Sequence, residues 1–120
     1  MTNRGSGLMR AALLLLVGAC AMGCSVSTGN PALDDARRAC ETARGLSDAV
    51  ADGAIVAGDD AASLRDVTWY AARAYDANPV GFGTLQSLLR HFTRAAATGG
   101  EVAVSALGAA DAECRRVGAP

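Results

Sequence analysis

The fold is decided by the stretch from residue 30 to residue 50, NPALDDARRACETARGLSDAV, which carries the signals of a helix start. Asn30 is a preferred N-cap residue, and Pro31 suits the first helical position because an N–H there would have no helical partner. Asp34 and Asp35 place negative charge near the positive end of the helix dipole. The stretch therefore predicts that a first helix begins at residue 31.

Apolar residues recur along the same stretch at helical spacing and define the face that the helix would bury. Intervals of three and four residues are typical of one stripe of an α-helix. The stripe consists of Leu33, Ala36, Cys40, Ala43, Leu46 and Val50. Gly45 and Gly53 weaken a helix interior, and Gly45 is where a bend is expected. We expect this helix to run to about Ala57.

A second helix is predicted from Ala61 to Ala77. The turn at residues 58–60 contains Asp59 and Asp60, one of which would cap this helix. Its expected core face consists of Leu64, Val67, Thr68, Ala71 and Tyr75.

Two further helices are predicted in the second half of the chain. Asn78-Pro79 repeats the start signal of the first helix and predicts a third helix to about Thr98, although Gly81 and Gly83 leave Thr84 as an alternative start. Its stripe consists of Phe82, Leu85, Leu89, Phe92 and Ala96. A fourth helix is expected from about Glu101 to Val117, with a stripe of Ala103, Leu107, Ala110, Cys114 and Val117.

A positively charged and then apolar segment precedes this helical region. Arg4 and Arg10 supply the charge, no acidic residue occurs before Asp34, and residues 11–23 form an apolar run. Export signals have this order, with an apolar region of about 7–15 residues. A permanent membrane span needs about 20 apolar residues, and a core helix would show a polar face, which this run lacks. The segment therefore predicts an export signal.

The end of this segment resembles the lipobox of bacterial lipoprotein precursors, in which small residues precede a cysteine that becomes acylated. Two stretches match, Val17-Gly18-Ala19-Cys20 and Ala21-Met22-Gly23-Cys24. The resemblance implies acylation of Cys24, which has the longer apolar region and a glycine before it, with Cys20 as the alternative. Ordinary cleavage after Ala21 would instead release a soluble secreted protein.

The resemblance also implies an order of segments and a location. Residues 1–23 would be the lipoprotein signal peptide, residues 24–30 a flexible tether and residues 31–120 the helical domain. Acyl chains such as palmitate would hold the protein on the outer, extracytoplasmic side of the cell membrane. A tether of six small residues would reach about 13 Å. No functional family is recognised for residues 31–120.

The composition of the chain favours some partners and excludes others. All eleven basic residues are arginine, and this bias, with frequent alanine and glycine, is typical of high-GC bacteria such as actinobacteria. Nine of the arginines and all twelve acidic residues follow Cys24, which gives that part a net charge of about −3. Nucleic-acid binding requires a basic face, so this composition argues against it.

Four helices joined by short connections predict an all-α fold, a small four-helix up-down bundle. The first and fourth helices would then be antiparallel neighbours, with Cys40 and Cys114 at similar heights on apolar stripes. An oxidising envelope favours a disulfide between them. Such a bond would stabilise an alanine-rich domain by roughly 4 kcal/mol in the chain-entropy model.

The chain shows no arrangement of residues typical of catalysis. The single histidine, His91, has no implied partner, and Asp59 with Asp60 makes a weak cation site without further oxygen ligands. Gly81-Phe82-Gly83 is too short for a phosphate-binding loop. We therefore expect no enzyme activity, no metal and no cofactor.

Trp69 and Tyr70 are the candidate partner contacts. A helical wheel places Trp69 off the apolar stripe, at a helix edge where its ring either closes the bundle or meets a partner. Arg37-Arg38 and Arg115-Arg116 flank the two cysteines, and they would form either an anion site or a set of ion pairs with nearby acids.

Two functions follow as hypotheses. The first is a membrane-anchored envelope lipoprotein that acts as a non-enzymatic interaction module and contacts another envelope protein. The alternative is a carrier of a small hydrophobic ligand or lipid in the bundle core, in an apolar cavity lined by Leu64, Phe82, Leu85 and Phe92.

Overall fold

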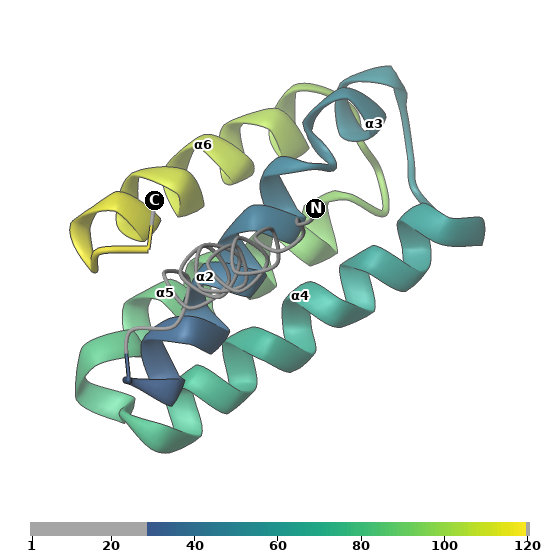
Figure 1. Cartoon of the computed structure of the whole chain (residues 1–120). Coiled ribbons are helices and arrows are strands. Elements are labelled where there is room, and N and C mark those ends of the chain that lie inside the picture. Colours follow the sequence, from purple (N-terminus) through teal and green to yellow (C-terminus); the bar gives the residue numbers. More distant parts are fainter. Residues whose placement is uncertain (1–28, 120) are drawn as a thin grey trace, which may run out of the picture.

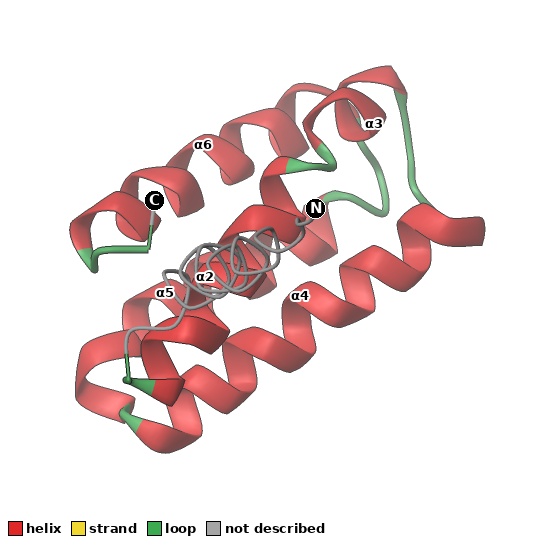
Figure 2. Ribbon diagram, in the orientation of Figure 1, coloured by secondary structure: helices red, strands yellow, loops and turns green. Residues whose placement is uncertain are grey.

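The computed structural model describes residues 29–119, which contain five helices and no strand (Figures 1 and 2). The helices are α2 (Pro31–Arg44), α3 (Ser47–Asp52), α4 (Gly58–Ala77), α5 (Pro79–Ala95) and α6 (Gly100–Arg116). Short connections join them, and four of the five are long enough to form the sides of a bundle.

The four long helices pack in a closed ring. α2 lies along α4, α4 along α5 and α5 along α6, and α6 completes the ring against α2 and α3. A disulfide joins Cys40 of α2 to Cys114 of α6, with 6.2 Å between their Cα atoms. An ion pair joins Arg44 of α2 to Asp111 of α6. The later residue of α2 thus pairs with the earlier residue of α6, so the two helices are antiparallel. The predicted four-helix bundle and its disulfide are thus confirmed.

The core is built from small side chains around a few large ones. Among the largest fully buried side chains are Phe92, Leu85 and Leu89 of α5, together with Val50 and Val67. Most of the other buried residues are alanines, whose small side chains let helix backbones approach closely. The apolar stripe predicted for the third helix is buried throughout, and that of the fourth helix is buried up to Cys114.

Two asparagines fix the starts of α2 and α5. The side-chain oxygen of Asn30 accepts a hydrogen bond from the Leu33 N–H at 3.2 Å, and that of Asn78 accepts one from the Gly81 N–H at 3.0 Å. Each bond satisfies one of the N–H groups that have no partner within the helix. α5 therefore begins at Pro79, and the alternative start at Thr84 is wrong.

The first predicted helix is shorter than expected and divided. α2 ends at Arg44, a turn at Gly45 and Leu46 follows, and α3 ends at Asp52, so the predicted run to Ala57 is wrong. Residues 53–57 instead form a loop that returns the chain to α4. The Ile55 N–H donates to the carbonyl oxygen of Ala96 at 2.9 Å, which ties this loop to the end of α5. This long-range bond replaces the helical bonds that were expected there.

The structure also corrects the start and the inner face of the second predicted helix. α4 begins at Gly58, so Asp59 and Asp60 lie in its first turn and neither aspartate is the cap. Thr68 and Tyr75 are exposed, whereas Ala74 is buried with Val67 and Ala71. The inner face is thus rotated relative to the prediction, because α2 and α5 both pack against α4 and together select which edge of its apolar stripe is covered.

Candidate functional site

The predicted contact residues Trp69 and Tyr70 belong to a set of side chains that we call the aromatic–arginine cluster: Asp35, Arg38, Trp69, Tyr70 and Arg73. The two rings meet edge to face, with centroids 5.0 Å apart and planes at 76°. The Arg73 guanidinium lies 4.8 Å from the Trp69 ring centroid, and that of Arg38 lies 5.6 Å from the Tyr70 centroid. Arg73 also donates to Asp35 at 3.3 Å.

Helix packing explains how the cluster is assembled. Trp69 and Arg73 are one turn apart on α4, a spacing that places their side chains next to each other. Asp35 and Arg38 come from α2, which packs along α4, so they reach the cluster from the neighbouring helix (Figure 1). The sequence pattern placed neither arginine beside the aromatic rings, and it had assigned Arg38 to an anion site or a set of ion pairs near the cysteines. The spacing of Trp69 and Arg73 could have indicated one of them, but Arg38 could be found only from the packing of α2 on α4.

Trp69 is the aromatic member of the cluster that a partner can reach, beside the exposed Arg38 and Arg73. Trp69 is 54% exposed, while Tyr70 is partly buried and packs against the core. Cation–π contacts contribute about 0.5–1 kcal/mol each at exposed sites, so Arg73 helps to hold the indole in place. The cluster therefore presents a large aromatic side chain in a restrained position, with charged groups around it.

The arginines near the disulfide are paired with acids. Asp111 accepts hydrogen bonds from Arg44 of α2 and from Arg115 of its own helix. Glu113 accepts two hydrogen bonds from Arg116. Arg38 lies over the Tyr70 ring, on the side of α2 that faces α4. These contacts favour a set of ion pairs, rather than an anion site, as the role of the two arginines on α6.

One of these pairs changes the ionisation of its members. The hydrogen bonds from Arg116 lower the pKa of the Glu113 carboxyl, an effect that desolvation opposes. The same hydrogen bonds raise the pKa of Arg116. The pair lies within α6, three residues apart, and stabilises the last turns of that helix.

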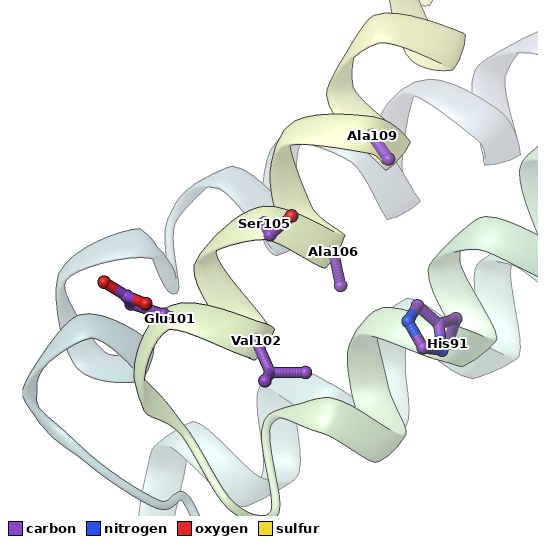
Figure 3. Close-up of a pocket in the computed structure, with 6 residues that line it drawn as sticks. All are labelled: His91, Glu101, Val102, Ser105, Ala106 and Ala109. Atoms are coloured by element: carbon purple, nitrogen blue, oxygen red, sulfur yellow. The ribbon is translucent and has the colours of Figure 1, made fainter.

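A shallow groove of about 410 Å³ lies between α5 and α6 (Figure 3). Its α6 side carries Glu101, Val102, Ser105, Ala106 and Ala109, and His91 faces them from α5. His91 is exposed here. Methyl groups make up half of its lining residues, and the polar groups are one imidazole, one hydroxyl and one carboxylate.

The residues that were expected to line a ligand cavity lie in or against the hydrophobic core. Phe82, Leu85 and Phe92 are buried in the core, and Leu64 is partly buried against it. They belong to the hydrophobic core rather than to the groove. The carrier hypothesis stays a prediction.

Other features that bear on function can be assessed over residues 29–119. Asp59 and Asp60 are exposed, and within this range no group of three or more His, Cys, Asp and Glu side chains is placed to hold a metal ion. No helix in the described part of the chain is long and apolar enough to cross a membrane. Cys20, Cys24 and the predicted signal peptide lie outside the described residues.

Comparison with protein-family models, with curated proteins and with solved structures found no match to this chain.

Proposed function

We propose that this protein is an exported, membrane-anchored interaction module of a bacterial envelope, which binds another envelope protein and catalyses no reaction. The N-terminal charge pattern and its cysteines support export and acylation. The disulfide between Cys40 and Cys114 supports an oxidising compartment. Cleavage after Ala21, giving a soluble secreted protein, is the alternative that the experiments below distinguish.

The observation that carries the proposal is the restrained exposure of Trp69. Tryptophan and arginine are enriched among the few residues that provide most of the binding free energy of protein interfaces. Trp69 is more than half exposed, yet Arg73 and Tyr70 contact its ring, so its position is set before binding. A restrained side chain loses less conformational entropy when a partner covers it.

Acylation is tested with the full chain in its native host, supplied with a labelled fatty acid. We expect label in the wild-type protein, loss of label in one of Cys20→Ala and Cys24→Ala, and no label in the double variant. If the double variant is still labelled, or if the wild-type protein is not, the anchor proposal is wrong. Release of the unlabelled wild-type protein into the medium would favour cleavage after Ala21.

Partner binding is tested by capturing the tagged full chain from native envelopes and comparing wild type with Trp69→Ala. Truncation of a central tryptophan costs about 2 kcal/mol or more, so the Kd should rise at least about 30-fold. Trp69→Phe should restore part of the recovery. Val56→Ala is the matched control, because Val56 is exposed in the loop before α4 and lies outside the cluster.

The same captures separate this proposal from the carrier hypothesis. Proteins recovered equally with wild type and Trp69→Ala would contradict a role for Trp69 in binding. A stoichiometric hydrophobic molecule in every capture, with no Trp69-dependent protein, would favour the carrier instead. Circular dichroism and retention of the Cys40–Cys114 bond should show that each variant is folded.

A further inference from the structure

One end of the bundle carries an exposed apolar corner where α4 passes into α5. We call it the α4–α5 corner: Tyr75, Ala77, Pro79 and Val80. All four residues are exposed, and Val80, at 97%, is the most exposed large hydrophobic residue in the described part of the chain. The Tyr75 ring lies against the start of α5, since a Cβ at Gly83 would be 3.7 Å from it. Residues 77–89 contain no charged residue, so this corner is uncharged from the end of α4 onward.

The chain enters the helical region at the same end of the bundle. Asp35 of α2 pairs with Arg73 of α4. Arg38, three residues later on α2, lies over Tyr70, three residues earlier on α4, so the two helices are antiparallel. Going back five residues from Asp35 reaches Asn30, and going forward five residues from Arg73 reaches the end of α4. Figure 1 shows the start of α2 and the α4–α5 connection at one end of the bundle.

The proposed acylation of Cys24 would hold this end of the bundle next to the membrane. Six residues lead from Cys24 to Asn30, and they span about 20 Å at full extension. α4 contains 20 residues, so the opposite end of the bundle lies about 30 Å farther along this helix. The α4–α5 corner is therefore on the end of the molecule that the anchor keeps close to lipid.

The opposite end of the bundle is acidic. α3 and the first turns of α4 and α6 carry five exposed acids, Asp48, Asp52, Asp59, Asp60 and Glu101. The last turns of α2 and α5 bring Arg44 and Arg94 to that end, which leaves an excess of negative charge. At the other end, α2 has Asp34 in its first turn, α4 has Asp76 before its end, and the first turn of α5 has no acid. Anionic lipids therefore repel the far end more than the corner.

We propose that the α4–α5 corner rests on the lipid surface to which the protein is anchored, with Val80 and Tyr75 in the membrane interface. This contact rests on the proposed acylation of Cys24 and adds a second, non-covalent contact with the membrane. Tyrosine is enriched at membrane–water interfaces, and an apolar side chain leaves water there. Asp76 keeps the contact shallow, because a carboxylate does not enter hydrocarbon without a large cost.

The anchor and the corner act together. Two side chains bind lipid weakly by themselves, but a short tether raises their effective concentration at the surface. Trp69 lies eight residues before Ala77, about 12 Å from the corner along α4. A bundle that stands on this corner consequently leaves the aromatic–arginine cluster open to a protein partner.

The test compares two exposed valines on either side of α4. Val80 follows this helix, and Val56, which is 78% exposed, precedes it. Trp69→Phe removes the single tryptophan of the chain, after which Val80→Trp or Val56→Trp places one indole at either end. Acylated protein from the native host is reconstituted in vesicles of phosphatidylethanolamine and phosphatidylglycerol, with and without bromine on the acyl chains. We expect blue-shifted emission that brominated lipid quenches at position 80, and neither effect at position 56.

A second reporter leaves Val80 in place. In the Trp69→Phe background, Tyr75→Trp should also be quenched by brominated lipid. Adding Val80→Asp should lower that quenching, because an aspartate at the corner disfavours the interface. Adding Val56→Asp is the matched control and should leave the quenching unchanged. Circular dichroism should show that each variant is folded.

The outcomes separate this contact from the anchor itself. Mass spectrometry and flotation with the vesicles measure acylation directly, and a protein without acyl chains would overturn the anchor and the lipid contact together. An acylated protein that floats, but whose indoles at positions 80 and 56 are quenched equally or not at all, would overturn the lipid contact alone. So would blue-shifted, unquenched emission at position 80, because protein rather than lipid would then cover the corner. Equal effects of Val80→Asp and Val56→Asp would also overturn it.

Discussion

Gly99 lies where the α5–α6 connection passes the chain that leaves α3, and two constraints meet at this residue. Its φ is +72°, a region that side chains with a Cβ rarely adopt. A Cβ at this position would also overlap the backbone carbonyl of Gly53. The sequence Gly99-Gly100 indicated a helix stop, but the second constraint depends on a residue 46 positions earlier and has no local signal.

We predict that Gly99→Ala destabilises the protein by more than about 2 kcal/mol, because a left-handed backbone cost of about 1–2 kcal/mol adds to the overlap with Gly53. Gly58→Ala is the matched control. Gly58 also has a positive φ, of +82°, but open space around it, so only the backbone cost applies. Urea denaturation measures both free energies of unfolding, and equal losses would contradict the close approach.

The lowered pKa of Glu113 predicts the direction in which the stability of the folded protein changes with pH. Its pKa in the folded state is lowered from 4.5, so the unfolded chain binds this proton more readily. The stabilisation is therefore fully present above pH 4.5 and is lost as the pH falls through the folded pKa. We expect the Tm difference between pH 7 and pH 3 to shrink in Glu113→Gln. An unchanged difference would show that the Arg116 pair does not contribute.

At the scale of elements, periodicity predicted where helices lie better than which edge of each one is buried. For α4, the predicted face (Leu64, Val67, Thr68, Ala71 and Tyr75) and the observed one (Leu64, Val67, Ala71 and Ala74) both fit helical spacing and share three residues. The period alone cannot choose between them, and the packing of α2 and α5 does. The sequence pattern also could not predict that α3 ends at Asp52. The hydrogen bond from Ile55 to Ala96, which holds the chain after α3 in a loop, is a tertiary contact.

The inner face of α4 can be checked with two neighbouring substitutions. Val67→Ala removes a fully buried side chain and should cost about 2 kcal/mol. Thr68→Ala alters an exposed residue and should change the free energy of unfolding by less than about 0.5 kcal/mol. Denaturant unfolding of both variants at one pH makes the comparison. A cost at Thr68 as large as that at Val67 would return Thr68 to the buried face, as the sequence pattern predicted.

At the scale of the whole molecule, the bundle and its disulfide were predictable because separate arguments agreed. Cys40 and Cys114 lie on the apolar stripes of the first and last helices, and an up-down ring makes those helices neighbours. The aromatic–arginine cluster was predictable only in part. Trp69 and Tyr70 were found as exceptions to the stripe, whereas Arg38 required knowledge of how α2 and α4 pack.

We predict that replacing both Cys40 and Cys114 by alanine lowers the free energy of unfolding by about 4 kcal/mol. The bond spans 74 residues, so in the chain-entropy model it removes much of the freedom of the unfolded chain. Both sulfurs are buried, and the small cavities left by alanine add to the loss. Guanidinium unfolding should show a lower midpoint. A midpoint equal to that of wild type would contradict a stabilising role.

The position of this disulfide also determines what happens when the backbone is cut. Cys40 and Cys114 enclose most of the helical region, including the loop at residues 53–57, where Ala54, Val56 and Ala57 are exposed. A peptidase that cleaves this loop would leave the two fragments covalently joined, and the cut would become visible only after reduction. The bond therefore gives the molecule tolerance to proteolytic nicking, because fragments held together at α2 and α6 remain able to keep the bundle assembled.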